Sequence, residues 1–271
     1  MTQTNNKPIA LITGASSGIG AAFAQQLASK GFDLILTGRR QDKLDASQHA
    51  LTQQFNCTVE IIRAELTNPD DIARIEARIK TCENLTLLIN NAGFGTRDLF
   101  IKTPIEKHLA MLQVHNAAPL RFIHAALPGM MKRKCGSIIN VSSMLSYMSQ
   151  IYTVNYSASK AYLIALSRVL NKELKNTNIH VQCLCPGLTY SDFFQREELK
   201  ETKIYQQIPR WLWMLPEQVA MASLAALSTK KCVVVPGATN RFFHTLLDMA
   251  RALNHCRIYR RNRKWCEKPS P

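Results

Sequence analysis

The sequence lacks both a long uninterrupted apolar run and any pair of cysteines at zinc-site spacing. A membrane-spanning helix needs about 20 mostly apolar residues, and the apolar runs of this chain are much shorter. Its eight cysteines form no CxxC pair and have no histidines at zinc-finger spacing. The first residues, MTQTNNKPIALITG, have no charged segment followed by a long apolar stretch. We therefore expect a cytoplasmic protein with free thiols and no metal site.

Acidic residues are also scarce, since 19 Asp and Glu stand against 34 Lys and Arg, a formal net charge of +15. Such a charge attracts nucleic acid, anionic lipid or acidic substrates such as nucleotides and phosphopantetheine carriers. No helix-turn-helix or RNA-recognition pattern accompanies the charge, so nucleic acid is not a favoured partner. Seven of the basic residues lie between Arg251 and Lys268, where Glu267 is the only acid. Much of the excess charge therefore belongs to the C-terminal segment.

Neither a linker, a repeat nor a low-complexity tract divides the chain. Helix-length segments, among them 70–81, 104–132, 154–176 and 216–228, alternate with short runs that are apolar at successive residues, as in strands buried on both faces. These runs are PIALITG, DLILTG, TVEIIRAEL, NLTLLINNAG, GSIINVSS, IHVQCLCPG and KCVVVPG. This order predicts a single-domain doubly wound α/β (Rossmann) fold, with a parallel sheet of about seven strands and helices on both faces.

A glycine-rich turn joins the first expected strand to the first expected helix. The segment TGASSGIG places Gly14, Gly18 and Gly20 where a tight turn brings helix N–H groups to a pyrophosphate. After the second strand, where an NAD-binding protein usually has an acidic residue, this chain has Arg39 and Arg40. Guanidinium groups match the geometry of a 2′-phosphate. We therefore predict NADP(H) as cofactor, preferred over NAD(H), with two solvated arginines as the alternative.

Tyr156 and Lys160, in the segment NYSASK, are four residues apart and would face the same way on a helix. Taken alone, this pair also fits a solvated helix face with a snorkelling lysine. Together with the other motifs, it resembles the signature of the short-chain dehydrogenase/reductase family. TGASSGIG resembles that family's cofactor loop, NNAG at 90–93 its fourth-strand motif, and the PG pair at 186–187 the turn beside the nicotinamide. The resemblance covers roughly residues 8 to 237.

The resemblance implies two sets of site residues. The catalytic set is Asn116, Ser143, Tyr156 and Lys160. The cofactor-binding set is Gly14, Ser16, Ser17, Gly18, Ile19, Gly20, Arg39, Arg40, Glu65, Leu66, Asn91, Ala92, Gly93, Tyr156, Lys160, Pro186, Gly187, Thr189 and Ser191. The chain departs from the family pattern at Glu65, where Asp is common, and at Ser191, where Thr is usual; neither change argues against cofactor binding.

In the mechanism that the resemblance implies, Tyr156 is the general acid for reduction of a carbonyl. A tyrosine titrates near ~10, and a cation close by favours the phenolate, so we expect Lys160 to lower the pKa of Tyr156. Ser143 would hydrogen-bond the carbonyl oxygen, with Ser142 as the alternative. Asn116 would position a water that relays protons towards Lys160. His115, beside it, is expected to be structural.

The segment after the PG turn is expected to form a substrate lid at about 188–215 of the domain 1–239. It contains Phe193, Phe194, Tyr205, Trp211 and Trp213. Aromatic loops of this kind favour an apolar ketone, aldehyde or secondary alcohol as substrate, although at least half of these rings should pack on the scaffold.

The basic extension, residues 240–271, carries apolar residues at helical spacing (Phe242, Phe243, Leu246, Leu247, Ala250 and Leu253) followed by the basic cluster with Tyr259 and Trp265. This combination suits a weak, peripheral contact of the extension with the surface of an anionic membrane. The alternative is that the helix packs on the domain or on a second subunit.

Three other functions compete with an NADPH-dependent oxidoreductase. An epimerase or dehydratase also uses Tyr-x-x-x-Lys, but the chain leaves no room for a substantial second domain. A nucleotide-binding regulatory or scaffold protein would keep the fold without turnover, which the intact Ser143, Tyr156 and Lys160 disfavour. Binding of nucleic acid by the basic extension has no supporting motif. A homo-oligomer, dimer or tetramer, is also expected.

Overall fold

The computed structural model describes residues 7–96, 98–148, 150–192 and 208–249. Their strands form one seven-stranded sheet in the order β3-β2-β1-β4-β5-β6-β7, in which every neighbouring pair is parallel. The strands are β1 (Ile9–Thr13), β2 (Asp33–Gly38), β3 (Val59–Arg63), β4 (Leu85–Asn90), β5 (Gly136–Val141), β6 (Ile179–Leu184) and β7 (Val233–Val234). The predicted doubly wound α/β fold is confirmed.

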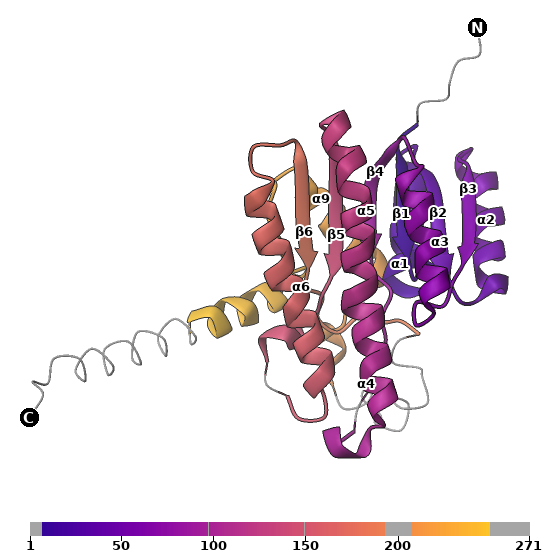
Figure 1. The fold of residues 1–271 in the computed structure, drawn as a ribbon. Helices are drawn as coiled ribbons and strands as arrows, with labels where there is room; N and C mark the ends of the chain where they lie inside the picture. Colours follow the sequence, from indigo (N-terminus) through magenta and orange to yellow (C-terminus); the bar gives the residue numbers. More distant parts are fainter. Residues whose placement is uncertain (1–6, 97, 149, 193–207, 250–271) are drawn as a thin grey trace, which may run out of the picture.

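Helices cover both faces of this sheet. One face carries α1 (Gly18–Ser29), α2 (Gln41–Phe55) and α9 (Pro216–Leu227), and α1 packs against α9. The other face carries α3 (Pro69–Lys80), α5 (Ala118–Arg133) and α6 (Val154–Glu173), which stand in front of the sheet in Figure 1. Short 3-10 turns occur at Phe100–Lys102, Met144–Tyr147 and Arg210–Leu212. None of the helices in the described ranges is long and apolar enough to span a bilayer.

The apolar strands contribute to two large buried cores, one on each side of the sheet, beside a smaller third cluster. Phe23 and Leu27 of α1 fill the first, and Ile72, Ile75 and Phe122 of the opposite helices fill the second. All five side chains are essentially inaccessible to solvent. Strands buried in this way account for the continuous apolar runs of the sequence.

The segment 104–132, expected to be helical throughout, is divided. It begins with α4 (Ile105–Leu112), passes through a π-helical turn at Gln113–Ala117, and continues as α5. Pro119 follows this turn closely inside the continuous helix and, as a proline, has no N–H to donate to a carbonyl of the turn. A π-helical turn inside a helix frequently marks a functional site, and this one carries His115 and Asn116.

The order of the strands decides where a ligand can bind. From β1 the chain builds outwards through β2 to β3, and then returns to place β4 on the other side of β1. The loops after β1 and β4 therefore diverge to opposite faces of the sheet and leave a crevice at the carboxyl ends of the strands.

The chain after β7 is helical at 238–249. Figure 1 draws this helix in yellow, at the end of the sheet where the strands finish. It crosses the boundary predicted between residues 239 and 240, and that division remains a prediction.

Candidate functional site

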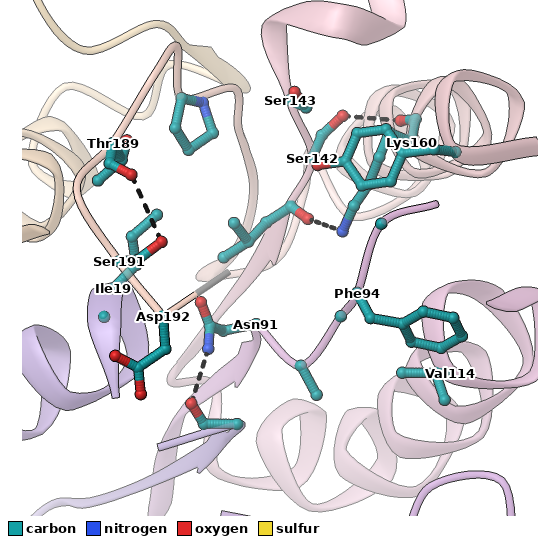
Figure 2. A pocket seen from close by; sticks show the side chains of 18 of the residues that line it. Ile19, Asn91, Phe94, Val114, Ser142, Ser143, Lys160, Thr189, Ser191 and Asp192 are labelled. Atoms are coloured by element: carbon teal, nitrogen blue, oxygen red, sulfur yellow. Dashed lines mark hydrogen bonds between the residues drawn. The ribbon is translucent and has the colours of Figure 1, made fainter. Parts of the chain in front are cut away.

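A cavity of about 1440 Å³ opens at the carboxyl ends of the strands. The loops after β1 to β6 all contribute to its wall. Of the residues expected to bind cofactor, only Gly20 is absent from this wall, and of the expected catalytic residues, only Asn116 is absent. Figure 2 shows Ser143 and Lys160 on one side of the cavity, with Ile19 and Asp192 on another and Asn91 between them.

The glycine-rich turn needs its glycines for two different reasons. Gly14 and Gly18 have φ angles of +68° and +56°, a region that side chains with a Cβ rarely adopt. Gly20 is needed for packing, because a Cβ there would collide with the carbonyl oxygen of Gly14. The amide of Asn91 donates to the carbonyl oxygens of Thr13 (2.9 Å) and Gly14 (3.1 Å). Asn91 thus holds the turn in place from the end of β4.

The two arginines after β2 have different surroundings. The Arg39 side chain is 60% exposed and has an ion pair with Glu65, with 3.2 Å between Nη1 and Oε2. Arg40 instead donates to Ser17 Oγ (2.7 Å) and to Asp192 Oδ2 (2.8 Å). Arg39 is therefore the more accessible donor for an anion, while Arg40 ties the glycine-rich turn to the loop after β6.

That second connection is strengthened by Lys43, whose Nζ lies 3.0 Å from the same oxygen of Asp192. Hydrogen bonds from Arg40 and Lys43 lower the pKa of Asp192. Sequence reasoning gave Asp192 no role, because nothing in its local sequence indicates that Arg40, just before α2, and Lys43, within α2, lie opposite.

At the other end of the cavity, Tyr156 and Lys160 are adjacent on the first turns of α6. Lys160 Nζ lies 5.9 Å from the centroid of the Tyr156 ring and donates to the carbonyl oxygen of Val141 at 2.8 Å. Ser143 follows β5 and has a side-chain hydrogen bond with Tyr156. The alternative, Ser142, donates its hydroxyl to the main chain of Lys160 at 2.7 Å. Ser143 is thus the serine whose hydroxyl lies beside Tyr156.

Burial dominates the titration of this pair. It raises the pKa of Tyr156 to about 12, although the hydrogen bond with Ser143 lowers it, and it lowers the pKa of Lys160 to about 8. The expected lowering of the Tyr156 pKa by Lys160 is therefore wrong for this structure, because removal of the phenol from water outweighs other influences. Tyr156 carries its proton at neutral pH, as a proton donor must.

Asn116 lies in the π-helical turn, behind the cavity wall. Its Nδ2 donates to the carbonyl oxygen of Ser159, in α6 between Tyr156 and Lys160, at 2.9 Å. Its Oδ1 is buried and has no hydrogen-bond partner in the part of the chain that the structure describes. An amide oxygen in this position can accept a hydrogen bond from a water molecule.

The loop after β6 brings Pro186, Gly187, Thr189 and Ser191 to the cavity. Thr189 Oγ1 donates to the carbonyl oxygen of Gly187 at 3.1 Å, and Ser191 Oγ to that of Thr189 at 3.4 Å. Their hydroxyls thus stabilise the loop itself. A Cβ at Gly18 would lie 2.9 Å from the Cβ of Ser191, so this loop packs closely on the glycine-rich turn.

The expected lid is described only in part. Phe193, Phe194 and Tyr205 lie outside the described residues. Trp213 is buried and stacks on Tyr190 with ring centroids 5.1 Å apart, whereas Trp211 is 67% exposed. Within the described part, Trp213 is therefore the buried one of the two expected rings, and its stacking partner Tyr190 belongs to the same segment. The rings at Tyr259 and Trp265, and the apolar Ala250 and Leu253, also lie outside it.

The structure adds wall residues that the sequence did not suggest. Phe94 follows the NNAG segment, and Asn240, Phe243 and Leu247 come from the helix 238–249. The helical spacing of Phe243 and Leu247 was visible in the sequence, but spacing alone does not say which surface a helix covers. No cluster of metal-ligating side chains occurs within residues 7–96, 98–148, 150–192 and 208–249.

A family model described as short chain dehydrogenase matches residues 8–202. The chain belongs to the short-chain dehydrogenase family. It is thus an oxidoreductase of a family that uses NAD(P)(H). The glycine-rich turn, the crevice beside β1 and β4 and the arginine donors fit such a dinucleotide.

Relatives of this short-chain dehydrogenase include 3-oxoacyl-acyl-carrier-protein reductase FabG of Rickettsia bellii, 33% identical over 85% of this chain and 92% of the relative. A short-chain dehydrogenase of Sphingobium yanoikuyae, solved in complex with NADPH, is 30% identical with a TM-score of 0.82 over 92% of this chain and 95% of its own. The bulky-bulky ketone specific alcohol dehydrogenase of Comamonas testosteroni is 29% identical with a TM-score of 0.80, over 93% and 95%.

Proposed function

We propose that this dehydrogenase transfers a hydride between NADP(H) and an apolar ketone, aldehyde or secondary alcohol, with Tyr156 as general acid and base. The observation that carries the proposal is the meeting of Ser143, Tyr156 and Lys160 at one end of a cavity whose other end holds Arg39. The cofactor supplies or accepts the hydride when bound.

The remaining chemistry belongs to the side chains of the chain itself. In reduction, the hydroxyl of Ser143 donates a hydrogen bond to the substrate oxygen and so stabilises the negative charge that develops there. Tyr156, protonated because its pKa is raised to about 12, transfers its proton to the same oxygen as the carbon becomes tetrahedral. In oxidation, Tyr156 would first have to release its proton along the path through Lys160, and its phenolate would then accept the proton of the alcohol.

Lys160 and Asn116 complete the proton path. With its pKa lowered to about 8, Lys160 can release and regain a proton near neutral pH, and its Nζ lies beside the Tyr156 ring. The free Oδ1 of Asn116 suits a water that connects Lys160 to solvent. This path would return a proton to Tyr156 after each turnover.

The cofactor preference rests on Arg39. Its guanidinium is exposed, lies in the cavity wall and can turn from Glu65 to a 2′-phosphate. The related structure from Sphingobium yanoikuyae, which contains NADPH, supports the same preference.

The substrate class rests on the apolar side chains that share the cavity with Ser143. Leu145 and Met148 lie two and five residues after Ser143, and Phe94, Phe243 and Leu247 reach the same cavity from other elements. This wall would favour a bulky apolar carbonyl compound over a small polar one. The name of the Comamonas relative points in the same direction.

The test is a panel of apolar ketones and aldehydes, with a 3-oxoacyl thioester as a comparison, in which NADPH oxidation is followed by absorbance. We expect turnover with bulky ketones that is lost in Tyr156→Phe. A chain that binds NADPH but reduces no compound of the panel would instead be a silent nucleotide-binding scaffold.

We further propose that the basic C-terminal extension, residues 240–271, makes a weak peripheral contact with anionic membranes. Phe242, Phe243, Leu246 and Met249 turn apolar surface outwards and are each 45–62% exposed. The seven Lys and Arg that follow could each add about 1 kcal/mol near an anionic surface. Since Phe243 also lines the cavity, such a contact would bring the opening of the cavity close to apolar compounds dissolved in the lipid.

Co-sedimentation with anionic and neutral vesicles at low and high salt tests this contact. A truncation after Met249 is the informative variant, because it removes the basic cluster and keeps the cavity residues Asn240, Phe243 and Leu247. We expect the full chain, and not the truncation, to pellet with anionic vesicles at low salt. Pelleting of neither would refute the membrane contact, and equal pelleting of both would refute the role of the basic cluster in it.

The remaining expectations concern assembly and the lid. We propose a homo-oligomer, because Ile105 and Leu109 of α4 and Val169 of α6 are each more than half exposed in the single chain. Light scattering would give the subunit number. We also propose that residues 188–215 act as a lid, with cleavage by trypsin in the presence and absence of NADPH as the test.

A further inference from the structure

His115 occupies a position from which it contacts both halves of the proposed active site. It lies in the π-helical turn, next to Asn116, and is inaccessible to solvent. Its Nε2 accepts a hydrogen bond from the main-chain N–H of Phe94 at 3.0 Å. Its Nδ1 lies 2.8 Å from the hydroxyl oxygen of Ser159. The side chain thus joins the turn after β4 to helix α6.

The bond with Phe94 fixes the tautomer of His115. A main-chain N–H can only donate, so Nε2 accepts and, in the neutral ring, Nδ1 carries the proton. His115 Nδ1 then donates to Ser159, whose hydroxyl donates to the carbonyl oxygen of Tyr156 at 2.8 Å. The three hydrogen bonds thus run in one direction, from the Phe94 N–H through His115 and Ser159 to the carbonyl oxygen of Tyr156.

Ser159 is the point at which two residues of the π-helical turn reach α6. Its hydroxyl receives the bond from His115, and its carbonyl oxygen receives the bond from the amide of Asn116 at 2.9 Å. Tyr156 and Lys160 flank Ser159 in the same helix. The orientation of this first part of α6 is thereby set from the π-helical turn.

On its other side, His115 supports the turn that begins with Asn91. A Cβ on Gly93 would lie 3.0 Å from His115 Nε2 and 3.5 Å from Lys160 Nζ, so the glycine passes between these two groups. The rings of Phe94 and Tyr156 both meet the His115 ring, each with centroids 5.7 Å apart. Asn91, Ala92 and Gly93 are residues assigned above to the cofactor.

We infer that His115 is a positioning residue with two separable functions. Its Nδ1 side orients Tyr156 through Ser159, and its Nε2 side holds the turn 91–94 against which the cofactor binds. The inference rests on the proposed function, because it assigns consequences to the proton donor and to the cofactor turn. A buried histidine that only fills space would have neither consequence.

Two substitutions separate the two sides. In His115→Gln, the amide oxygen can replace Nε2 as acceptor for Phe94, while the donor to Ser159 is lost. In His115→Asn, the shorter amide can replace Nδ1 as donor to Ser159, while the acceptor for Phe94 is lost. We expect His115→Gln to lower kcat about 10- to 100-fold with an unchanged Kd for NADPH, because a misplaced catalytic group is costly. We expect His115→Asn to raise that Kd about 2- to 10-fold, with a smaller effect on kcat.

Ser159→Ala tests the first side independently of the histidine. It removes the hydroxyl that links His115 to Tyr156 and should reproduce the loss of kcat at unchanged Kd. His124→Gln and His124→Asn are the matched controls, since His124 is an exposed histidine of the neighbouring helix α5. Both controls should behave as the parent.

The measurements are the Kd for NADPH from fluorescence titration, kcat with the best ketone of the panel, and the melting temperature of each variant. Equal changes of Kd and kcat in the Gln and Asn variants, or a fall in melting temperature with both constants within twofold of the parent, would overturn the inference. If the parent reduces no ketone, the proposed function fails, whereas the Kd values of the two His115 variants still test the cofactor side.

Discussion

Replacing Arg39 by alanine should weaken NADPH binding and leave NADH binding unchanged. The two cofactors differ only in the 2′-phosphate, so a difference between them isolates the group that contacts it. In the structure the Arg39 guanidinium is 60% exposed and has Glu65 as an ion-pair partner at 3.2 Å. It must give up this partner, at least in part, to bind a phosphate.

The size of the effect follows from these two contacts. Hydrogen bonds to a charged group contribute about 1.5–3 kcal/mol, and the exposed pair with Glu65 is worth about 0.2–1 kcal/mol. The difference, roughly 0.5–2.8 kcal/mol, corresponds to a loss of about 2- to 110-fold in NADPH affinity. In the variant, the preference for NADPH over NADH should decrease by the same factor.

Fluorescence titration with both cofactors measures this prediction, and Arg40→Ala is the comparison. Arg40 donates to Ser17 in the glycine-rich turn and to Asp192, so its removal should weaken NADH as well as NADPH. An Arg39→Ala chain that binds NADPH as tightly as the parent, or that loses NADH to the same extent, would refute the assignment of Arg39 to the 2′-phosphate.

Three further predictions concern the other groups of the site. Tyr156→Phe should keep NADPH affinity and lower kcat by about 10² to 10⁴, as measured by single-turnover absorbance; a variant within twofold of the parent would remove Tyr156 from the mechanism. Because burial lowers the pKa of Lys160 to about 8 from 10.5, the unfolded chain holds this proton in a pH range where the folded chain has lost it, and stability rises with pH between these values. Lys160→Met should therefore be more stable than the parent at pH 7, by about 3 kcal/mol, and by less at pH 10. Urea unfolding of both proteins at the two pH values measures this, and an equal difference in the free energy of unfolding at pH 7 and pH 10 would contradict the prediction. Gly20→Ala should cost about 1–3 kcal/mol in the same assay because its Cβ meets the Gly14 carbonyl, whereas Gly38→Ala, with 3.5 Å to its nearest neighbour, should cost less.

The fold could be predicted from the sequence because its signals are local. Strands buried on both faces require continuous apolar runs, and six of the seven expected strands have nearly the expected bounds. The seventh, in KCVVVPG, is reduced to Val233–Val234 at the edge of the sheet. The π-helical turn was missed because helical spacing does not reveal one inserted residue in a turn.

The site was predictable where a motif follows a strand and unpredictable where distant segments meet. Residues after β1, β2, β4 and β5 had recognisable patterns, and all but Gly20 and Asn116 of the expected set lie in the cavity wall. The ion pair between Arg40 and Asp192 joins residues 152 positions apart, and no local sequence pattern predicts it. The raised pKa of Tyr156 likewise depends on burial by the whole fold. The four-residue spacing between Tyr156 and Lys160 gives no information about that burial.

The last wall of the cavity is also the last described part of the chain to be synthesised. A domain generally folds as a unit, and during synthesis the glycine-rich turn and β1 to β3 emerge before the rest of this one. Asn240, Phe243 and Leu247 emerge only after β7. A nascent chain thus lacks this wall of its cavity until the helix 238–249 has been made, so the domain cannot complete the apolar end of its site before that helix emerges.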